Sequence, residues 1–295
     1  MVSTWSINGK TVQTLTINGK EVQSIIRTND NVVLYEKPST SPTPSSITLV
    51  SNQSILAYND SESATLTATV KDANNTVIEG VTVEFYKGST SLGTSTTNNN
   101  GIATKTYSST GAGDVSFTAT AGNVTSSAIT IEDCAYYNTT ESSITRGSSY
   151  QQQFAIATNV IGKNDNWVLT FDAKGTSKGG CLNIGANGQY TLNSSTANYR
   201  LGIGFDYVSS RLVYYANNRT SSSSATTIGS PSSNTYYSFK MERNGTTITF
   251  YYGTTLFATK TVSWLGNYNQ YDLYPSVWSG TNSKLTWKNI KLKKI

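Results

Sequence analysis

The 295-residue chain contains no histidine, which removes the commonest general base and the commonest metal ligand from its side chains. Its only cysteines, Cys134 and Cys181, could form one disulfide in an oxidising compartment or remain as two buried thiols. Neither thiol is expected to act as a nucleophile, because there is no histidine to activate it. Charged residues make up 13% of the chain, fewer than a cytosolic enzyme usually carries.

The residues that are abundant are typical of β-structure. The chain has 19 tyrosines, 23 glycines and only 8 phenylalanines, and Ser, Thr and Asn supply most of its polar side chains. Thr and Tyr suit a pleated, half-exposed sheet, while Asn and Gly favour tight turns. No run of about 20 apolar residues is present, so we expect no membrane insertion. The composition predicts an all-β protein that is long enough for two or three domains.

The net charge of +5 is unevenly distributed. Residues 1–44 carry +1, residues 45–132 carry −4, and residues 133–295 carry +8 from fifteen basic and seven acidic side chains. A basic terminal module favours an anionic surface, such as a phosphorylated or uronic-acid glycan. Its basic residues are scattered rather than clustered in runs, so nucleic acid is not an expected partner.

Residues 1–37 contain an internal repeat. The sequence Ile-Asn-Gly-Lys of residues 7–10 recurs at residues 17–20, and each copy predicts two short strands around an Asn-Gly turn. So short a segment cannot bury a full core, so it either packs on another chain as an anchor or stands alone as a small β-module. A linker with three prolines follows at residues 38–45 and predicts an extended spacer.

Residues 46–132 alternate apolar and polar side chains over short runs that are separated by turn sequences. About seven such runs in about 90 residues are typical of an immunoglobulin-like sandwich. The runs at 68–72 (ATVKD), 78–85 (IEGVTVEF), 97–103 (TNNNGIA) and 117–122 (FTATAG) resemble the bacterial Ig-like (Big) repeats of adhesins and intimins. In that family the module is mostly a spacer, so the resemblance implies no binding site in this segment.

Residues 133–295 are expected to hold the largest core. Strands are predicted at residues 167–173, 181–184, 199–205, 211–215, 271–278 and 285–292. The strongest local signal is a hairpin around Asn244-Gly245. The hairpin sequence FKMERNG and the closing sequence LTWKNIKL resemble the concanavalin A-like, laminin-G-like jelly rolls. That fold has many functions, so the resemblance implies sugar or protein binding only in general terms.

Acidic residues in this last segment show no catalytic or metal-binding pattern. A glycoside hydrolase needs two carboxylates about 5 to 10 Å apart, and the Glu-x-Asp-x-x-Glu motif of some jelly-roll hydrolases is missing. Asp172 and Asp206 could still converge in space, but we expect no enzyme activity and no catalytic residue. The sequence 164–166 (NDN), or Asp206 alone, could offer oxygens to Ca²⁺, but a turn is the favoured explanation, since Asn and Asp favour turns for their own reasons. No metal site or cofactor is therefore expected, with Ca²⁺ left open.

The aromatic residues of the same segment indicate sugar binding. Sugar rings stack their apolar C–H faces on aromatic planes, and the stretch 264–272 (WLGNYNQYD) interleaves aromatics with Asn and Asp in a predicted loop. The candidate ligand-binding residues are Tyr207, Tyr214, Trp264, Asn267, Tyr268, Asn269, Tyr271 and Asp272. Core packing is the favoured alternative for a strand aromatic, and we expect it of Trp167, Tyr215, Tyr251, Tyr274, Trp278 and Trp287.

These features together predict an all-β adhesin, or receptor-binding protein, with three modules. A small N-terminal β-module (1–37) and the linker (38–45) precede an Ig-like β-sandwich (46–132). A concanavalin A-like jelly roll (133–295) follows, and its lectin-like surface is expected to bind a host cell-surface glycan or cell-wall polymer. The chain could form homo-oligomers.

The repeated Ile-Asn-Gly-Lys opening resembles the start of tail-associated proteins of phages and archaeal viruses. Residues 1–9 lack the charged and apolar regions of a signal peptide, which fits a virion component released by lysis, although a fragment with an added Met would look the same. The resemblance implies a virion tail or extracellular location, with residues 1–37 bound to a tail protein. The alternatives are a polysaccharide-degrading tail enzyme and a cellular surface adhesin with a structural or protein-binding role.

Overall fold

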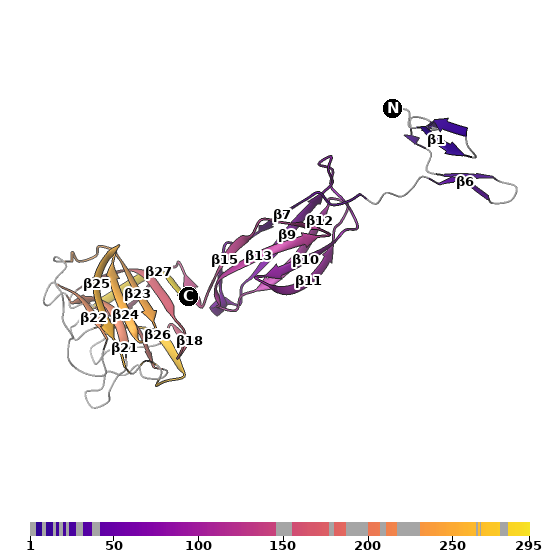
Figure 1. The fold of residues 1–295 in the computed structure, drawn as a ribbon. Coiled ribbons are helices and arrows are strands. Elements are labelled where there is room, and N and C mark those ends of the chain that lie inside the picture. Colours follow the sequence, from indigo (N-terminus) through magenta and orange to yellow (C-terminus); the bar gives the residue numbers. More distant parts are fainter. Residues whose placement is uncertain are drawn as a thin grey trace. The chain divides into compact units, whose positions relative to one another are not determined.

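The chain is described by a computed structural model that divides into two compact units, Met1–Thr43 and Pro44–Ile295 (Figure 1). The residues that it describes are 4–7, 10–13, 16–17, 20–21, 24–27, 32–36, 42–145, 155–176, 180–186, 200–206, 211–216, 231–263, 265, 267–277 and 283–295. These residues form β-strands and one short 3-10 turn, so the predicted all-β fold class is confirmed. Within them, no helix is long and apolar enough to cross a membrane.

The first unit contains three antiparallel hairpins. Their strands are β1 (Thr4–Ile7) with β2 (Lys10–Gln13), β3 (Thr16–Ile17) with β4 (Lys20–Glu21), and β5 (Ser24–Arg27) with β6 (Val32–Glu36). Ile7 pairs with Lys10 and Ile17 pairs with Lys20, so each copy of the repeat forms a hairpin. The Asn-Gly residues predicted to make the two turns lie outside the described residues.

The Ig-like domain is a sandwich of two sheets near the start of the second unit. Its strands are β7 (Ser46–Ser51), β8 (Ile55–Ala57), β9 (Ser63–Lys71), β10 (Thr82–Lys87), β11 (Thr90–Thr96), β12 (Ile102–Ser108), β13 (Gly113–Ala121), β14 (Val124–Thr125) and β15 (Ile129–Cys134). One sheet has the order β12-β9-β7, and the other has the order β11-β10-β13-β15-β8, with β14 paired to β13. Alternate residues of β9, from Ala64 to Val70, point into the core, as the two-residue period of a strand requires. The predicted Ig-like sandwich is confirmed.

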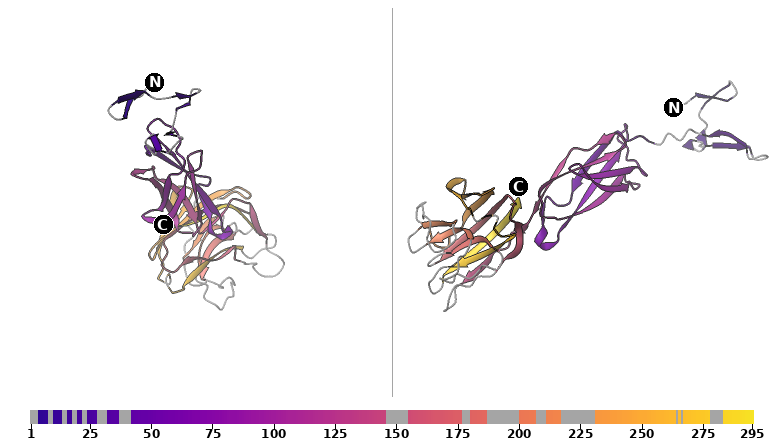
Figure 2. Two further views of the ribbon diagram at one scale, coloured as in Figure 1. Left: turned by 90° about the vertical axis from the view of Figure 1, so that its right-hand side faces the viewer. Right: turned by 60° about the horizontal axis from the view of Figure 1, so that its bottom comes forward.

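The remainder of the second unit is a jelly roll of two larger sheets, whose strands form facing layers (Figure 2). Its strands are β16 (Tyr136–Asn138), β17 (Ser142–Thr145), β18 (Ala157–Gly162), β19 (Trp167–Thr176), β20 (Gly180–Ala186), β21 (Arg200–Asp206), β22 (Arg211–Tyr215), β23 (Tyr237–Asn244), β24 (Thr247–Tyr252), β25 (Thr255–Thr261), β26 (Gln270–Val277) and β27 (Lys284–Lys294). One sheet has the order β16-β27-β19-β23-β24-β25, with β17 also paired to β27, and the other has the order β18-β26-β20-β21-β22.

Aromatic side chains fill the space between the two jelly-roll sheets. Phe205 of β21 meets Phe239 of β23 edge-on, with ring centroids 5.2 Å apart, and Phe239 also stacks on Phe171 of β19 at 5.3 Å. Each such side chain contributes roughly 1.5–3 kcal/mol to folding when it is fully buried. Both sheets therefore depend on one shared core, which gives a rigid base for the loops at its edges.

The predicted hairpin of residues 236–252 is present, but its turn lies one residue later than predicted. Asn244 still pairs with Thr247, so the two-residue loop consists of Gly245 and Thr246. Gly245 has φ +60° at the first loop position, which is the conformation that a type II′ turn requires and that glycine adopts without strain.

Both cysteines are buried and neither forms a disulfide, so the second of the two alternatives from the sequence holds. Burial raises the pKa of the Cys134 thiol to about 11, which keeps it protonated at neutral pH. Cys134 is the last residue of β15, at the point where the chain passes from the Ig-like domain into the jelly roll.

Candidate ligand pocket

The aromatic residues predicted to bind ligand lie mainly in the core or outside the described residues. Nothing is described of the side chains of Tyr207 and Trp264. Tyr214 is 2% exposed, and its ring packs against Phe250 with centroids 4.8 Å apart. Tyr271 is also buried in the core, so in this structure neither tyrosine presents a ring face to solvent.

The polar members of the predicted set are divided between the surface and the interior. Asn267 and Asn269 are exposed, and Tyr268 between them is half-buried with its ring edge-on to Tyr271. Asp272 is fully buried, and one of its carboxylate oxygens accepts a hydrogen bond from the backbone N–H of Asn159 at 2.6 Å. The structure therefore places these residues near one another along the chain but does not gather them on one accessible surface.

Core packing accounts for three of the six strand aromatics for which the sequence favoured it. Trp167, Tyr274 and Trp287 are all buried, whereas Tyr251 is half-buried beneath the ammonium group of Lys240, 3.8 Å from its ring centroid. The side chains of Tyr215 and Trp278 lie outside the described residues.

The face of the five-stranded sheet that points away from the core carries a second set of polar residues. Asn183 of β20 donates hydrogen bonds from its amide nitrogen to the Ser276 hydroxyl at 2.9 Å and to the Tyr274 carbonyl at 3.2 Å. Asn183, Ser276 and Asp272 are all fully buried. They support the sheet but offer no accessible polar surface in this structure.

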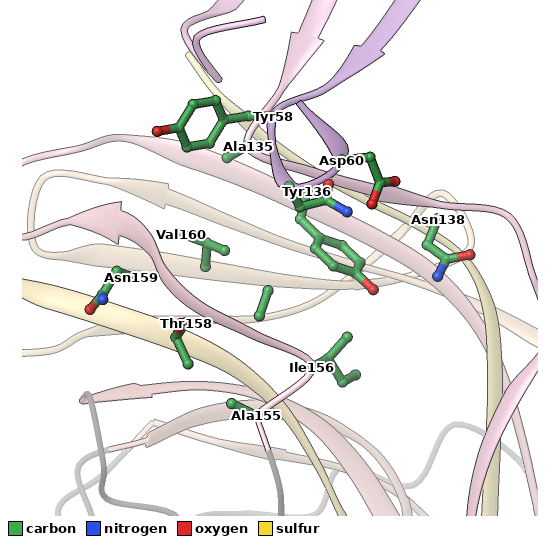
Figure 3. Close-up of a pocket in the computed structure, with 12 residues that line it drawn as sticks. Tyr58, Asp60, Ala135, Tyr136, Asn138, Ala155, Ile156, Thr158, Asn159 and Val160 are labelled. Atoms are coloured by element: carbon green, nitrogen blue, oxygen red, sulfur yellow. The ribbon is translucent and has the colours of Figure 1, made fainter. Parts of the chain in front are cut away.

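An accessible pocket of about 580 Å³ lies where the Ig-like domain meets the jelly roll (Figure 3). Its described lining comes from three short segments: η1 (Tyr58–Asp60), the chain around β16, and the start of β18. The lining residues are Tyr58, Asn59, Asp60, Ala135, Tyr136, Asn138, Ala155, Ile156, Ala157, Thr158, Asn159 and Val160. Two domains therefore form its walls together.

The wall from the Ig-like domain is a single 3-10 turn that exposes an aromatic ring. Tyr58 is 57% exposed, so its ring is accessible from solvent. The turn is closed by Ser61, whose φ of +54° lets its N–H bond to the Tyr58 carbonyl at 3.1 Å. Glu62 accepts the Ala57 N–H at 2.7 Å, and this bond anchors the start of the turn. The ring is thus presented by a fixed backbone.

Beneath Tyr58 lies Gly111, at a position that only glycine fits well. Its φ is +65°, and an added Cβ would lie 3.2 Å from the Ala135 Cα and 3.3 Å from the Tyr58 Cβ. The Gly111 N–H donates to the carboxylate of the buried Asp133 at 3.1 Å. The pocket wall is therefore supported by the hydrogen-bond network around Asp133.

The opposite wall is formed by the irregular start of β18. The pairing of β18 with β26 shifts register between Ala157 and Ile161, and Asn159 within this bulge has φ +57°. Asp272 of β26 accepts the Asn159 N–H, and the Leu273 carbonyl accepts the Ile156 N–H at 2.8 Å. The predicted site residue Asp272 thus holds the pocket wall in place from behind.

Tyr136 lies between the two walls, and polar residues around it affect the pKa of its hydroxyl group (Figure 3). Burial raises the pKa of Tyr136, a hydrogen bond with Asn138 lowers it, and the nearby charge of Asp60 raises it, with a net increase. The phenol is therefore neutral at physiological pH and can donate or accept a hydrogen bond. Asp60 is the only charged side chain among the described lining residues.

Contacts between the two domains hold the pocket walls together. Asn59 accepts the Tyr137 N–H at 3.1 Å, which ties η1 to β16. The ammonium group of Lys293 lies 2.9 Å from both carboxylate oxygens of Asp114. Lys291 forms a second ion pair with Glu132. Ion pairs at a surface contribute only modestly to stability, but these two hold β27 beside β13 and β15.

Sequence reasoning missed the residues of η1, because residues 46–132 were interpreted as a spacer. A signal was present: the sequence Tyr58-Asn59-Asp60 places an aromatic ring beside an amide and a carboxylate, as in the stretch 264–272. The exposure of Tyr58 could not be predicted from the sequence, because it depends on the turn that Ser61 closes and whose start Glu62 anchors.

The residues considered for Ca²⁺ are engaged by protein donors. Asp165 accepts the Gly162 N–H at 2.8 Å and pairs with Lys294 at 3.0 Å, and Asn166 accepts the Gly245 N–H at 2.8 Å. Within the described part of the chain, no group of three or more His, Cys, Asp or Glu residues could hold a metal ion. The side chain of Asp206, the other residue considered, lies outside that part.

Comparison with known proteins agrees with the fold of the Ig-like domain. Residues 46–132 match the bacterial Ig-like domain (group 1) family. No curated protein matches the chain. Among solved structures, the carbohydrate-binding module CBM66 from Bacillus subtilis is similar at 12% identity and a TM-score of 0.35, over 53% of this chain and 92% of that one.

Enzymes also occur among the similar structures. A Bacillus licheniformis β-glucanase shares 15% identity at a TM-score of 0.35, over 52% of this chain and 78% of that one. A family 7 alginate lyase, A1-II′, shares 8% identity at a TM-score of 0.38, over 54% of this chain and 84% of that one. A binding module and enzymes thus both occur among the structures to which the chain is similar. The prediction that the chain is not an enzyme is contradicted, since the β-glucanase and the alginate lyase are among the structures to which the chain is similar.

Proposed function

We propose that the chain is an attachment protein that binds a cell-surface glycan through its second unit. The observation that carries the proposal is the junction pocket, which is lined by the exposed Tyr58 and by Asp60, both from η1, together with the amide residues Asn59, Asn138 and Asn159. Its volume of about 580 Å³ is within the range of roughly 300–1,000 Å³ that is usual for small-molecule sites.

The lining residues have the chemistry that a sugar requires. An exposed aromatic plane can stack on the apolar C–H face of a sugar ring. Carboxylate and amide groups, here Asp60, Asn138 and Asn159, can accept or donate hydrogen bonds to neighbouring hydroxyls. The walls are held by the Glu62, Asp133 and Asp272 hydrogen bonds, so little ordering is needed on binding, which favours affinity.

The biological setting that we propose is the tail of a virion, with the glycan on the surface of the host cell. Support comes from the repeated Ile-Asn-Gly-Lys sequence of residues 1–37, which resembles the opening of tail-associated proteins. In this proposal residues 1–37 bind a tail protein, and the second unit binds the host glycan.

The proposal is tested by binding of the full chain to intact candidate host cells, with purified cell-wall glycans as competitors. We expect saturable binding that a glycan competitor abolishes. Binding that resists every glycan but is lost when the cells are treated with protease would contradict glycan recognition and indicate a protein receptor. Soluble sugar is measured in the same mixture, because its release would show that the bound glycan is also cleaved.

A further inference from the structure

We propose that the junction pocket selects an uncharged glycan, N-acetylated sugars included, and that the Ig-like domain supplies an essential part of this site. This inference rests on the proposed glycan binding and specifies its ligand class and location. It gives the Ig-like domain a role in recognition beyond that of a spacer, and it differs from the anionic glycan that the net charge of residues 133–295 would favour.

The charge of the lining is the first argument. Asp60 is the only charged residue among the described lining residues, so a uronic acid or phosphate group in the pocket would lie near a like charge. None of these residues is a lysine or an arginine, which are the side chains that usually pair with such anions. Hydroxyl and acetamido groups need no counter-ion and can be bound by the carboxylate, the amides and the phenols present.

The basic residues of the C-terminal module do not make up for the absence of lysine and arginine from the described pocket lining. Lys291 and Lys293 of β27 are paired with Glu132 and Asp114 of the Ig-like domain. Lys294 pairs with Asp165. A net charge of the whole module can steer an encounter over long distances, but short-range selection depends on the groups that touch the ligand.

The contribution of the Ig-like domain is the second argument. Tyr58, Asn59 and Asp60 include the exposed ring and the only charged side chain of the described lining, and all three precede the jelly roll in sequence. Figure 3 shows Tyr58 and Asp60 projecting from one wall, with Ile156, Thr158 and Val160 on the other. A jelly roll without η1 would therefore present only the less polar wall.

The test uses the full chain and an immobilised panel of oligosaccharides that includes chitotetraose, mannotetraose and tetragalacturonate. We expect wild-type binding to neutral members and at least tenfold weaker binding to tetragalacturonate. Tyr58→Ala and Asp60→Asn are each expected to weaken the neutral binding at least tenfold. Val50→Ala and Glu79→Gln, at exposed positions of the same domain outside the pocket lining, are matched controls that should bind as wild type does.

The outcomes separate this inference from the proposed function. If wild type binds neutral glycans and both pocket variants bind equally well, glycan binding stands and the junction site is wrong. If wild type prefers tetragalacturonate, the proposed ligand class is wrong. If wild type binds no member of the panel and no cell-wall glycan, both proposals fail. Thermal unfolding of each variant within about 3 °C of wild type shows that the fold is intact, since both substituted side chains are exposed.

Discussion

Asp133 shows how a single buried carboxylate organises one end of the Ig-like domain. It accepts hydrogen bonds from the hydroxyls of Tyr107 at 2.6 Å and of Thr110 at 2.9 Å, from the Ser109 hydroxyl, and from the backbone of Gly111. Burial alone would raise the pKa of Asp133, but the bonds from Ser109, Tyr107 and Thr110 outweigh it and lower the pKa from its ordinary value. The carboxylate is therefore ionised in the folded protein at neutral pH.

Asp133→Asn is expected to lower the free energy of unfolding by about 2–3 kcal/mol at pH 7, because several donors lose a charged acceptor. The lowered folded-state pKa means that this contribution is fully present above the ordinary pKa and is lost as the pH falls through the folded-state value. The difference between wild type and variant should therefore shrink below about pH 4. Urea unfolding of both proteins at pH 7 and pH 3 measures this difference in stability. Equal stability of wild type and variant at pH 7 would contradict a stabilising role for the Asp133 carboxylate.

Nothing in the sequence distinguishes Asp133 from the other acidic residues, since its partners lie more than twenty positions earlier in the chain. The same limit applies to Tyr214 and Tyr271, which have the residue type of a sugar site but the burial of core residues. At the scale of residues, a sequence indicates chemistry but not accessibility, because accessibility depends on contacts that are distant along the chain.

Elements with a regular pattern were predictable, and the elements that form the pocket were not. Strands β19, β23 and β24 alternate buried and more exposed residues over most of their length, so the two-residue period reveals them. The bulge in β18 breaks that period near Asn159, and η1 is too short to have one. Irregular elements of this kind are common at functional sites, where they re-aim side chains.

Asp272 was predicted to bind ligand, and in the structure it instead holds the β18 wall of the pocket. Asp272→Ala removes the acceptor of the Asn159 N–H, and we expect the β18 wall to relax and glycan affinity to fall at least fivefold. Asp272→Asn retains a carbonyl oxygen at the same place and should preserve most of the affinity. Titration calorimetry with a glycan from the panel compares the two. Equal loss in both variants would show that the negative charge matters more than the hydrogen bond.

For the whole molecule, the modules could be anticipated but their association could not. The Ig-like and jelly-roll folds follow from strand patterns and family resemblance, and both are present. The sequence interpretation joined them as a spacer and a tip, whereas the structure makes them one compact unit with contacts such as Lys293 with Asp114. Those contacts bring η1 to the jelly roll, and the pocket exists because of them.

The central claim is that a glycan occupies the pocket between the two domains. A crystal structure of the full chain, or of residues 44–295, with a bound oligosaccharide from the panel would test it most directly. We predict that a sugar ring stacks on Tyr58 with its hydroxyls hydrogen-bonded to Asp60 and to the β18 wall. Sugar bound instead on the outer face of β20, β21 and β26, or at the Asn267–Asn269 surface, would contradict the account.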